Sequence, residues 1–269
     1  MGRGLPQVDV PGDWSDRLAA SLAHRQRDRR VRGIVVTDPF RAPLSPRLAY
    51  GRHRGPARLG SRRAAVLIAL YSNAQTGQLC LTLTRRPMSL SHHGGQICLP
   101  GGRIESGESA LDAALREYRE ELGVPLRGVR PLGSLAPIYV FASDNWVQTL
   151  VAAADSPDQP WRPDPSEVDQ VIEMPIRAIS AIPQVASSGV NVAGGPGRPA
   201  ATERRDAPVS IAARAAERTV REAAGGGASG YRFGYPEVRF VDCHGKRRSL
   251  WGATAMLLAE FAGIWNRTV

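Results

Sequence analysis

One stretch constrains this chain more than any other: Gly102 to Val124, which reads GRIESGESALDAALREYREELGV. It begins with a glycine turn and continues into a predicted helix from about Ser109 to Leu122. Gly123 follows the last helical residue, where a glycine commonly ends a helix because it tolerates the left-handed conformation. The glycine turn before this segment and the glycine after it predict a short helix with a defined start and a defined end.

Three glutamates on this predicted helix indicate its chemistry. Glu117, Glu120 and Glu121 are related by i, i+3 and i+4 spacing, so we expect all three to leave the same face. Carboxylates in one patch repel one another unless a cation lies among them, and hard oxygen ligands suit Mg²⁺ or Mn²⁺. We therefore predict a metal site. The alternative is a surface helix with an acidic stripe, which needs neither the glycine turn before it nor the glycine after it.

The spacing of the stretch resembles the Nudix box, the signature of a superfamily of hydrolases. The matching positions are Gly102, Glu108, Arg116, Glu117, Glu120, Glu121, Gly123 and Val124. Tyr118 departs from the pattern, because the family usually has a smaller aliphatic residue there. The resemblance implies an α/β/α sandwich with a mixed β-sheet. It also implies a pyrophosphohydrolase in which Glu117, Glu120 and Glu121 are catalytic and bind Mg²⁺ or Mn²⁺ as cofactor.

Other residues of the box are expected to support the site rather than to touch the substrate. Gly102 lies at the turn, where the lack of a side chain lets the backbone approach closely. Glu108 and Arg116 are expected to form an ion pair that orients the box, and Gly123 ends the helix. Further along, Glu167 has two interpretations: a solvated carboxylate, which we favour, or an additional ligand of the metal.

The residues just before the box give a narrower resemblance, to the coenzyme A pyrophosphatase branch of the family. The segment 83–102 reads LTRRPMSLSHHGGQICLPGG, and its matches are Arg86, Leu90, His93, Gly95, Gln96 and the final Pro-Gly-Gly. Ser91 and Leu99 depart, where the branch has Arg and Phe. Segments 173–175 and 250–255 also resemble segments that follow the box in these enzymes. The resemblance implies hydrolysis of coenzyme A, or of a derivative, to 3′,5′-ADP and 4′-phosphopantetheine.

Arg85, Arg86 and His93 are candidates for binding the substrate phosphates, since guanidinium groups pair well with phosphate. The alternative for the arginines is surface charge after a strand, and for His93 a hydrogen bond within its loop. Two other functions stay open. One is hydrolysis of another nucleoside diphosphate derivative, such as ADP-ribose or a dinucleotide. The other, which we disfavour because no carboxylate of the box is missing, is binding of a nucleotide or nucleic acid without turnover. A homodimer is a candidate assembly.

Composition agrees with an anionic substrate without requiring one. The 269 residues carry a net charge of +10, and Lys246 is the one Lys among many Arg; an Arg bias also arises in GC-rich genomes. Cys80, Cys98 and Cys243 lack metal-ligand spacing, and the first two are expected to be buried thiols in strands. No apolar run approaches the ~20 residues of a membrane span. The first residues lack the apolar core of a signal peptide, so we expect a cytoplasmic protein.

The chain divides into two regions of different composition. Residues 1–63 are expected to hold a helix at 13–30 and a basic arm. Residues 64–269 are expected to form the Nudix domain, with a flexible insertion at 187–230 that contains a short helix at 211–224. The expected strands are 64–71, 78–84, 96–99, 130–140, 146–153, 166–176 and 231–241, and the expected further helices are 109–122, 177–182 and 252–265. Because strands and helices alternate irregularly, the class is α/β with a mixed sheet.

Overall fold

A computed structural model describes residues 10–32, 60–90, 94–140, 143–182, 214–220 and 231–269. The helices are α1 (Trp14–Arg32), α2 (Ala110–Leu122), α3 (Ile176–Ser180) and α4 (Ala253–Thr268). The strands are β1 (Arg62–Ser72), β2 (Leu79–Arg85), β3 (Ile97–Cys98), β4 (Gly101–Arg103), β5 (Arg130–Ser134), β6 (Ile138–Val140), β7 (Asn145–Ala153), β8 (Gln170–Pro175), β9 (Arg214–Val220), β10 (Tyr231–Val241) and β11 (Arg247–Trp251).

The larger sheet is built around β1. This strand runs parallel to β7, with Ala64 opposite Val147, and antiparallel to β2, with Leu70 opposite Leu81. β4 also pairs with β1, β3 and β8 pair with β2, and β5 and β6 pair with β7. Since parallel and antiparallel pairs occur together, the sheet is mixed, and the predicted α/β class is confirmed.

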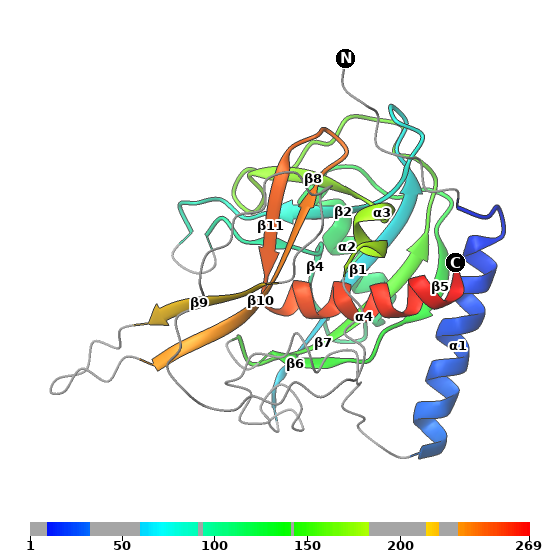
Figure 1. Cartoon of the computed structure of the whole chain (residues 1–269), viewed down its shortest axis with the longest axis horizontal. Coiled ribbons are helices and arrows are strands. Elements are labelled where there is room, and N and C mark those ends of the chain that lie inside the picture. Colours follow the sequence, from blue (N-terminus) through cyan, green and yellow to red (C-terminus); the bar gives the residue numbers. More distant parts are fainter. Residues whose placement is uncertain (1–9, 33–59, 91–93, 141–142, 183–213, 221–230) are drawn as a thin grey trace, which may run out of the picture.

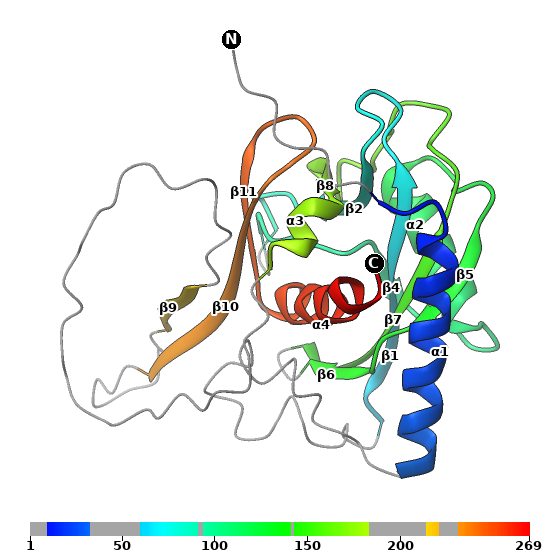
Figure 2. The same cartoon turned by 45° about the vertical axis from the view of Figure 1, so that its right-hand side comes forward.

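Helices cover both faces of this sheet (Figure 1 and Figure 2). Side chains alternate along β1: Ala65, Leu67 and Ala69 pack in the core beneath α2. Ile68 and Leu70 point the other way, into the core that holds α1, α3 and α4. A strand that is buried on both faces has a nearly continuous apolar sequence. The three layers form the predicted α/β/α sandwich.

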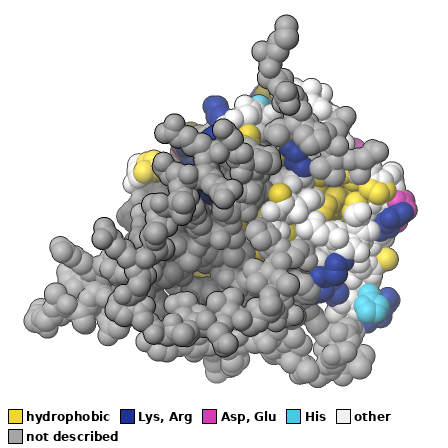
Figure 3. Space-filling model, viewed as in Figure 1, with side chains coloured by type: hydrophobic (Ala, Val, Ile, Leu, Met, Phe, Trp, Pro, Cys, Tyr) yellow, Lys and Arg dark blue, Asp and Glu magenta, His cyan; other side chains and the backbone are white. Residues whose placement is uncertain are grey.

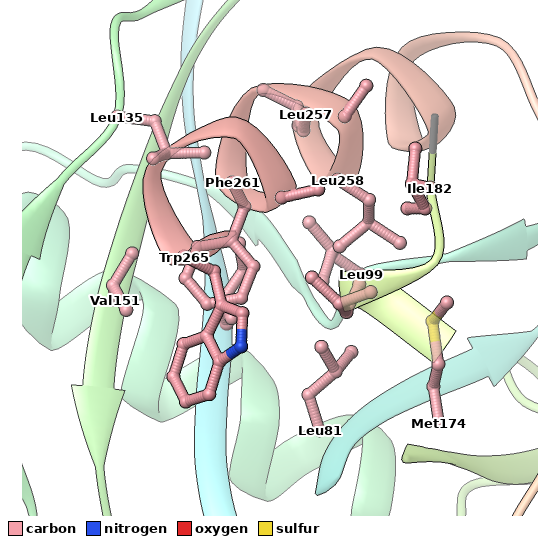
Figure 4. Packing of buried hydrophobic residues seen from close by; sticks show 14 of the residues in the cluster. Leu81, Leu99, Leu135, Val151, Met174, Ile182, Leu257, Leu258, Phe261 and Trp265 are labelled. Atoms are coloured by element: carbon pink, nitrogen blue, oxygen red, sulfur yellow. The ribbon is translucent and has the colours of Figure 1, made fainter. Parts of the chain in front are cut away.

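Helix α4 fills the larger of the two cores (Figure 4). The residues predicted to face inward are all buried: Leu257, Leu258, Phe261 and Ile264. Trp265 is buried as well, and Figure 4 shows it beside Val151 of β7. Truncating one such side chain to Ala typically costs about 2–5 kcal/mol of folding free energy. The helix therefore contributes much of the stability of this side of the sheet.

Helix α1 packs on the outside of the larger sheet, as predicted. Leu18 and Leu22 are buried. Gly133 of β5 lies under Leu22, where an added Cβ would come within 2.8 Å of the leucine side chain. The ring of Trp14 lies 5.8 Å from the ring of Trp265 in α4. These contacts join the first described helix to the last one, so both belong to one packed core.

The smaller sheet corrects one prediction. The sequence predicts a short helix at 211–224, which is wrong, because Arg214–Val220 forms β9 and pairs with β10, Val220 opposite Tyr231. β10 also pairs with β11. Ala, Arg and Glu favour a helix by a few tenths of a kcal/mol per residue, and backbone hydrogen bonds to a neighbouring strand override so weak a preference. The other residues of the predicted insertion at 187–230 lie outside the described residues.

The predicted strand 130–140 is divided into β5 and β6. Between them the backbone N–H of Ala136 donates to the carboxylate of Glu260 in α4, with an N···O distance of 3.1 Å. Glu260 is fully buried, and a buried carboxylate needs hydrogen-bond donors. The break in the strand therefore depends on a contact with a distant helix, which no local sequence pattern announces.

Other boundaries move by a few residues. β8 begins only at Gln170, because the Asp164 carboxylate holds the preceding turn by accepting from the N–H of Ser166 at 2.8 Å. β1 starts at Arg62, so it includes residues of the predicted N-terminal arm. β11 has no counterpart among the predicted strands. Leu250 is its only fully buried side chain, which leaves too short an apolar pattern to signal a strand.

On the face in Figure 3, the Lys and Arg side chains (dark blue) of the described residues are scattered, with apolar side chains (yellow) between them. Nucleic-acid binding usually requires a concentrated basic patch or stripe, and the described part of this face has none. Within the described ranges, every helix is too short or too polar to cross a bilayer.

Candidate active site

Helix α2 carries the three glutamates, and local contacts set both its ends. Ser109 is the N-cap, and its Oγ accepts from the N–H of Asp112 at 3.1 Å. Gly123 ends the helix with a φ of 68°, and its N–H donates to the carbonyl of Arg119. A side chain at Gly123 would also collide with the carbonyl of Arg162. The predicted helix, with its glycine end, is therefore confirmed.

Tyr118 packs the inner face of α2 against the sheet. Its hydroxyl hydrogen-bonds with Thr82 Oγ1 at 2.8 Å, and Thr82 does the same with the Tyr71 hydroxyl at 2.8 Å. Tyr71 donates to the Glu173 carboxylate at 2.9 Å, and Asn73 donates to the other Glu173 oxygen at 2.7 Å. The residue that departs from the Nudix pattern is thus accommodated by a buried network that connects α2 to β1, β2 and β8.

Arg116 gathers the acidic side chains on the outer face of α2. Its Nε donates to Glu108 at 2.9 Å, and its Nη1 donates to Glu117 at 3.0 Å and to Glu120 at 3.1 Å. Its Nη2 donates to the carbonyl of Arg103 in β4 at 2.9 Å. The bond from Arg116 holds the pKa of Glu108 below its usual value. The predicted Glu108–Arg116 ion pair is therefore present, and it joins the helix to the glycine turn.

Glu121 is the acidic side chain that lies deepest in the site. Only 8% of it is exposed, and its Oε2 is buried with no hydrogen-bond partner among the described residues. Burial above all, together with the charges of Glu117 and Glu167, raises the pKa of Glu121 to about 8, although the N–H of Gly101 and the charge of Arg86 act in the opposite direction. The described residues therefore offer the negative charge of an ionised Glu121 few hydrogen-bond donors and little positive charge.

Gly102 brings the backbone of β4 against the carboxylate of Glu117. A Cβ at Gly102 would overlap with the carboxyl group of Glu117. The strand also pairs with β1, with Gly102 opposite Ala65, so the backbone cannot move away without losing this pairing. Glycine here lets the Glu117 carboxylate lie against the backbone of β4, a position from which a side chain would displace it.

The structure does not bring the three predicted glutamates into one ligand set. Within the described ranges, no group of three or more His, Cys, Asp and Glu side chains is arranged to hold a metal ion. Glu120 is 57% exposed and lies against Arg116. The reason is helical geometry: Glu120 and Glu121 are neighbours in sequence and leave the helix about 100° apart. Glu117 lies between them, about 60° from Glu120 and about 40° from Glu121 around the helix. It shares Arg116 with Glu120, whereas Glu121 points into the buried part of the site.

The residues present fit a divalent cation nevertheless. The unpartnered Oε2 of Glu121 is a hard oxygen donor in a buried position. The charges of Glu117 and Glu167 act on it from nearby, although Glu167 itself is exposed. Oxygen donors of this kind suit Mg²⁺ or Mn²⁺. Glu167 is exposed, as expected for a solvated carboxylate, and its charge also reaches Glu121, as an additional ligand would require.

The structure separates the residues predicted to bind phosphate. Arg85 is taken up by Asp169, to which its Nε donates at 2.8 Å. Arg86 is half-buried, has no ion-pair partner in the described part of the chain, and acts by its charge on Glu121. An arginine that lies near the acidic site without a carboxylate of its own is available to an anionic ligand. His93 lies outside the described residues.

The start of α4 also lies near the candidate site. None of its residues was among the predicted site residues. The thiol of Cys98 hydrogen-bonds with Thr254, and burial raises the pKa of that thiol to about 11. The amide of Gln96 lies against Gly252, where an added Cβ would stand 3.4 Å from its nitrogen. The one sequence signal was the resemblance of residues 250–255 to a segment of coenzyme A pyrophosphatases.

Comparison with known proteins agrees with this geometry. Residues 61–191 match the family model described as NUDIX domain. This segment of the chain is similar to a Nudix domain. The match includes α2, Arg86 and Glu167, so the acidic residues discussed above lie within the matched segment.

Relatives of the Nudix domain have been identified in bacteria. The proteins called "Uncharacterized Nudix hydrolase NudL" of Salmonella paratyphi B and Salmonella newport are each 40% identical over 119 residues, which is 44% of this chain and 59% of theirs. The match thus spans less than two thirds of these relatives. A Nudix hydrolase from M. Smegmatis, RenU, is similar in structure at a TM-score of 0.33 and 23% identity, over 45% of this chain and 74% of that one.

Proposed function

We propose that this protein is a metal-dependent Nudix pyrophosphohydrolase that cleaves the diphosphate of coenzyme A or of a coenzyme A derivative. Glu121 carries this proposal: within the Nudix domain its Oε2 is buried and unpartnered, beside the charges of Glu117 and Glu167. A buried carboxylate without a partner is costly unless a cation compensates it. Mg²⁺ or Mn²⁺ is the cofactor that suits such oxygen donors.

Each side chain has a part in the proposed reaction. Glu117 and Glu121 would hold the cation, with Glu167 as a further candidate. A bound divalent cation neutralises diphosphate oxygens and lowers the pKa of the attacking water. Arg86 binds a phosphate oxygen, since its guanidinium is not paired within the described residues. Arg116 holds Glu117 in place by the bond of 3.0 Å.

The bond changes are those of hydrolysis. The oxygen of water attacks one phosphorus of the diphosphate, the bridging oxygen leaves with the other phosphate, and the water gives up a proton. A carboxylate of the box accepts that proton. Glu120, which is 57% exposed, is open to solvent and can pass the proton on. With coenzyme A the products are 3′,5′-ADP and 4′-phosphopantetheine.

The choice of coenzyme A rests on the segment before the box. Arg86 and Gln96, two of its matching residues, lie beside the acidic residues and the start of α4. Leu99, one of the two departures, is 4% exposed and belongs to the hydrophobic core, so it changes packing rather than substrate contacts. Ser91, the other departure, lies outside the described residues. It is the reason to retain ADP-ribose or a dinucleotide as the alternative substrate.

A substrate panel tests the proposal. The purified protein is incubated with coenzyme A, acetyl-coenzyme A, ADP-ribose and a dinucleoside polyphosphate, each with Mg²⁺, with Mn²⁺ and with chelator. We expect 3′,5′-ADP from the first two and none with chelator. Turnover of ADP-ribose alone would select the alternative substrate, and no metal-dependent turnover of any of them would reject the enzyme. Size-exclusion chromatography with light scattering tests the homodimer in the same preparation.

Two variants tie the activity to the site. Glu121→Gln keeps the shape of the side chain but removes its charge, and we expect at least a ~100-fold loss of turnover. Glu105→Gln is the matched control, because Glu105 is an exposed glutamate between β4 and α2 whose side chain makes no hydrogen bond or ion pair with the described residues of the site. An equal loss in both variants would point to a general effect of charge rather than to metal binding by Glu121.

A further inference from the structure

Two cysteines that are far apart in sequence meet beside the junction of the two sheets. Cys80 lies in β2, and its side chain is fully buried. Cys243 lies in the turn between β10 and β11 and is half-buried. The two thiols lie within hydrogen-bonding distance of each other. The third cysteine, Cys98, instead hydrogen-bonds with Thr254 at the start of α4.

Backbone contacts hold the two thiols together. Cys80 lies opposite Pro175 of β8, and its thiol donates to the carbonyl of Tyr71 at 3.5 Å. On the other side, the N–H of Cys243 donates to the carbonyl of Glu173 at 2.9 Å. β8 therefore pairs with β2, and near the same end it also holds the β10–β11 turn by a backbone hydrogen bond. The approach of the thiols does not depend on side-chain rotation alone.

The turn that presents Cys243 is itself well held. The buried carboxylate of Asp242 accepts from the N–H of His244 at 3.0 Å and from the N–H of Lys246 at 2.9 Å. Its second oxygen accepts from Nε of Arg248 at 2.8 Å. Three hydrogen bonds to one carboxylate fix the backbone on both sides of Cys243, so little conformational freedom remains to be lost when its sulfur bonds to a neighbour.

We propose that Cys80 and Cys243 form a disulfide when the protein meets a low-molecular-weight disulfide such as oxidised glutathione. The thiolate of the half-buried Cys243 attacks this oxidant, forms a mixed disulfide and releases one thiolate. The sulfur of Cys80 then attacks the sulfur of Cys243 and releases the second. The proton of Cys80 goes to the departing thiolate. Two cysteine thiols are oxidised, and one external disulfide is reduced to two thiols.

The disulfide would fasten the β10–β11 turn to β2. The closed loop runs from Cys80 to Cys243 and therefore includes α2, β8 and α3. Closing so long a loop restricts the unfolded chain. The native fold needs little adjustment, since the thiols are already in contact. We therefore expect oxidation to raise the Tm by about 5 °C or more. This inference concerns a site outside the Nudix box and does not depend on the substrate.

The test is oxidation of the whole protein with oxidised glutathione, followed by peptide mapping without reduction. We expect one cross-linked pair of peptides, joining Cys80 to Cys243, in the wild type and in Cys98→Ser. Cys98→Ser is the matched control, because it removes a half-buried thiol that takes no part in the pair. The link should be absent in Cys243→Ser and in Cys80→Ala, and the rise in Tm should follow the same pattern across the four proteins.

Several results would overturn the proposal. In one, Cys243 carries glutathione while Cys80 stays reduced, which means that the buried thiol cannot reach the mixed disulfide. In another, the main cross-link includes Cys98 or joins two copies of the chain. A confirmed Cys80–Cys243 link without any change in Tm would refute the stabilising effect. Because Cys243 is half-buried in a turn, Cys243→Ser should fold even where Cys80→Ala does not.

Discussion

Replacing Glu121 with Gln should stabilise the metal-free protein at alkaline pH. Burial, together with the charges of Glu117 and Glu167, raises the pKa of Glu121 to about 8. Above that pH the folded protein holds a carboxylate in a position that disfavours charge. Gln keeps the size of the side chain and the oxygen that accepts from the N–H of Gly101, but it has no charge.

The size of the effect follows from the two pKa values. Because the pKa of Glu121 in the folded state, about 8, exceeds its ordinary value of 4.5, this group stabilises the fold below pH 4.5 and loses that contribution as the pH rises through 8. At 1.36 kcal/mol per pKa unit, the complete loss is roughly 5 kcal/mol. Water that enters around the carboxylate reduces it, so we expect about 2–4 kcal/mol, or about 5–10 °C in Tm.

Thermal unfolding with and without metal measures this effect. In chelator at about pH 8.5, we expect Glu121→Gln to unfold at a higher temperature than the wild type, and at about pH 5 the gap should shrink by more than half. Added Mg²⁺ or Mn²⁺ should raise the Tm of the wild type, since it binds the folded state, but not that of Glu121→Gln. Glu105→Gln serves as the control and should match the wild type throughout.

Two outcomes would refute this reasoning. If the gap in Tm between Glu121→Gln and the wild type were the same at both pH values, the ionisation of Glu121 would not be what destabilises the metal-free protein. If the metal stabilised Glu121→Gln as much as the wild type, Glu121 would not be a ligand. The first result concerns the buried charge and the second concerns the metal, so the two parts of the argument fail separately.

Three further substitutions test other parts of the site. Gly102→Ala should lower turnover by at least ~100-fold, because its Cβ overlaps with the Glu117 carboxyl group; a metal titration of the rate measures it. Tyr118→Phe should cost about 1 kcal/mol in the free energy of unfolding by urea, since it removes the hydrogen bond to Thr82. Arg86→Ala should raise the KM for the diphosphate substrate by about 10-fold or more, in steady-state kinetics.

Matched variants separate these effects from general disruption. Gly12→Ala should leave activity unchanged, since nothing lies within 4 Å of an added Cβ there. Arg85→Ala should raise the KM less than Arg86→Ala, because the guanidinium of Arg85 is already paired with Asp169. Equal effects of the two arginine variants would mean that Arg86 has no special access to the substrate, and a Gly102→Ala enzyme with normal metal dependence would exclude the close approach as a requirement.

The sequence predicted those features whose causes are local. Helix α2 has its cap at Ser109 and its left-handed end at Gly123, and both act within one turn of the residues that they hold. The Glu108–Arg116 ion pair follows from spacing within the box and is present at 2.9 Å. The apolar run at 64–71 predicted a strand, and the two cores on either side of β1 explain why that run is almost continuously apolar.

Local sequence signals did not predict the structure where contacts with a distant part of the chain decide it. Residues Arg214–Val220 have the composition of a helix, yet pairing with β10 makes them a strand. Arg85 and Arg86 are neighbours with equal claims to a phosphate, and only the position of Asp169 distinguishes them. Pairing and burial of this kind depend on residues tens of positions away, so propensity and periodicity cannot detect them.

The sequence alone determined the helix of the Nudix box, the alternation of strands and helices, and the acidic residues that any metal would need. The tertiary structure decided which glutamate is buried without a partner, which arginine stays available and which two cysteines meet. The reason is physical. Helix caps and apolar periodicity are set by bonds between near neighbours in the chain, whereas the desolvation of a carboxylate and the contact of two thiols exist only once distant segments have packed together.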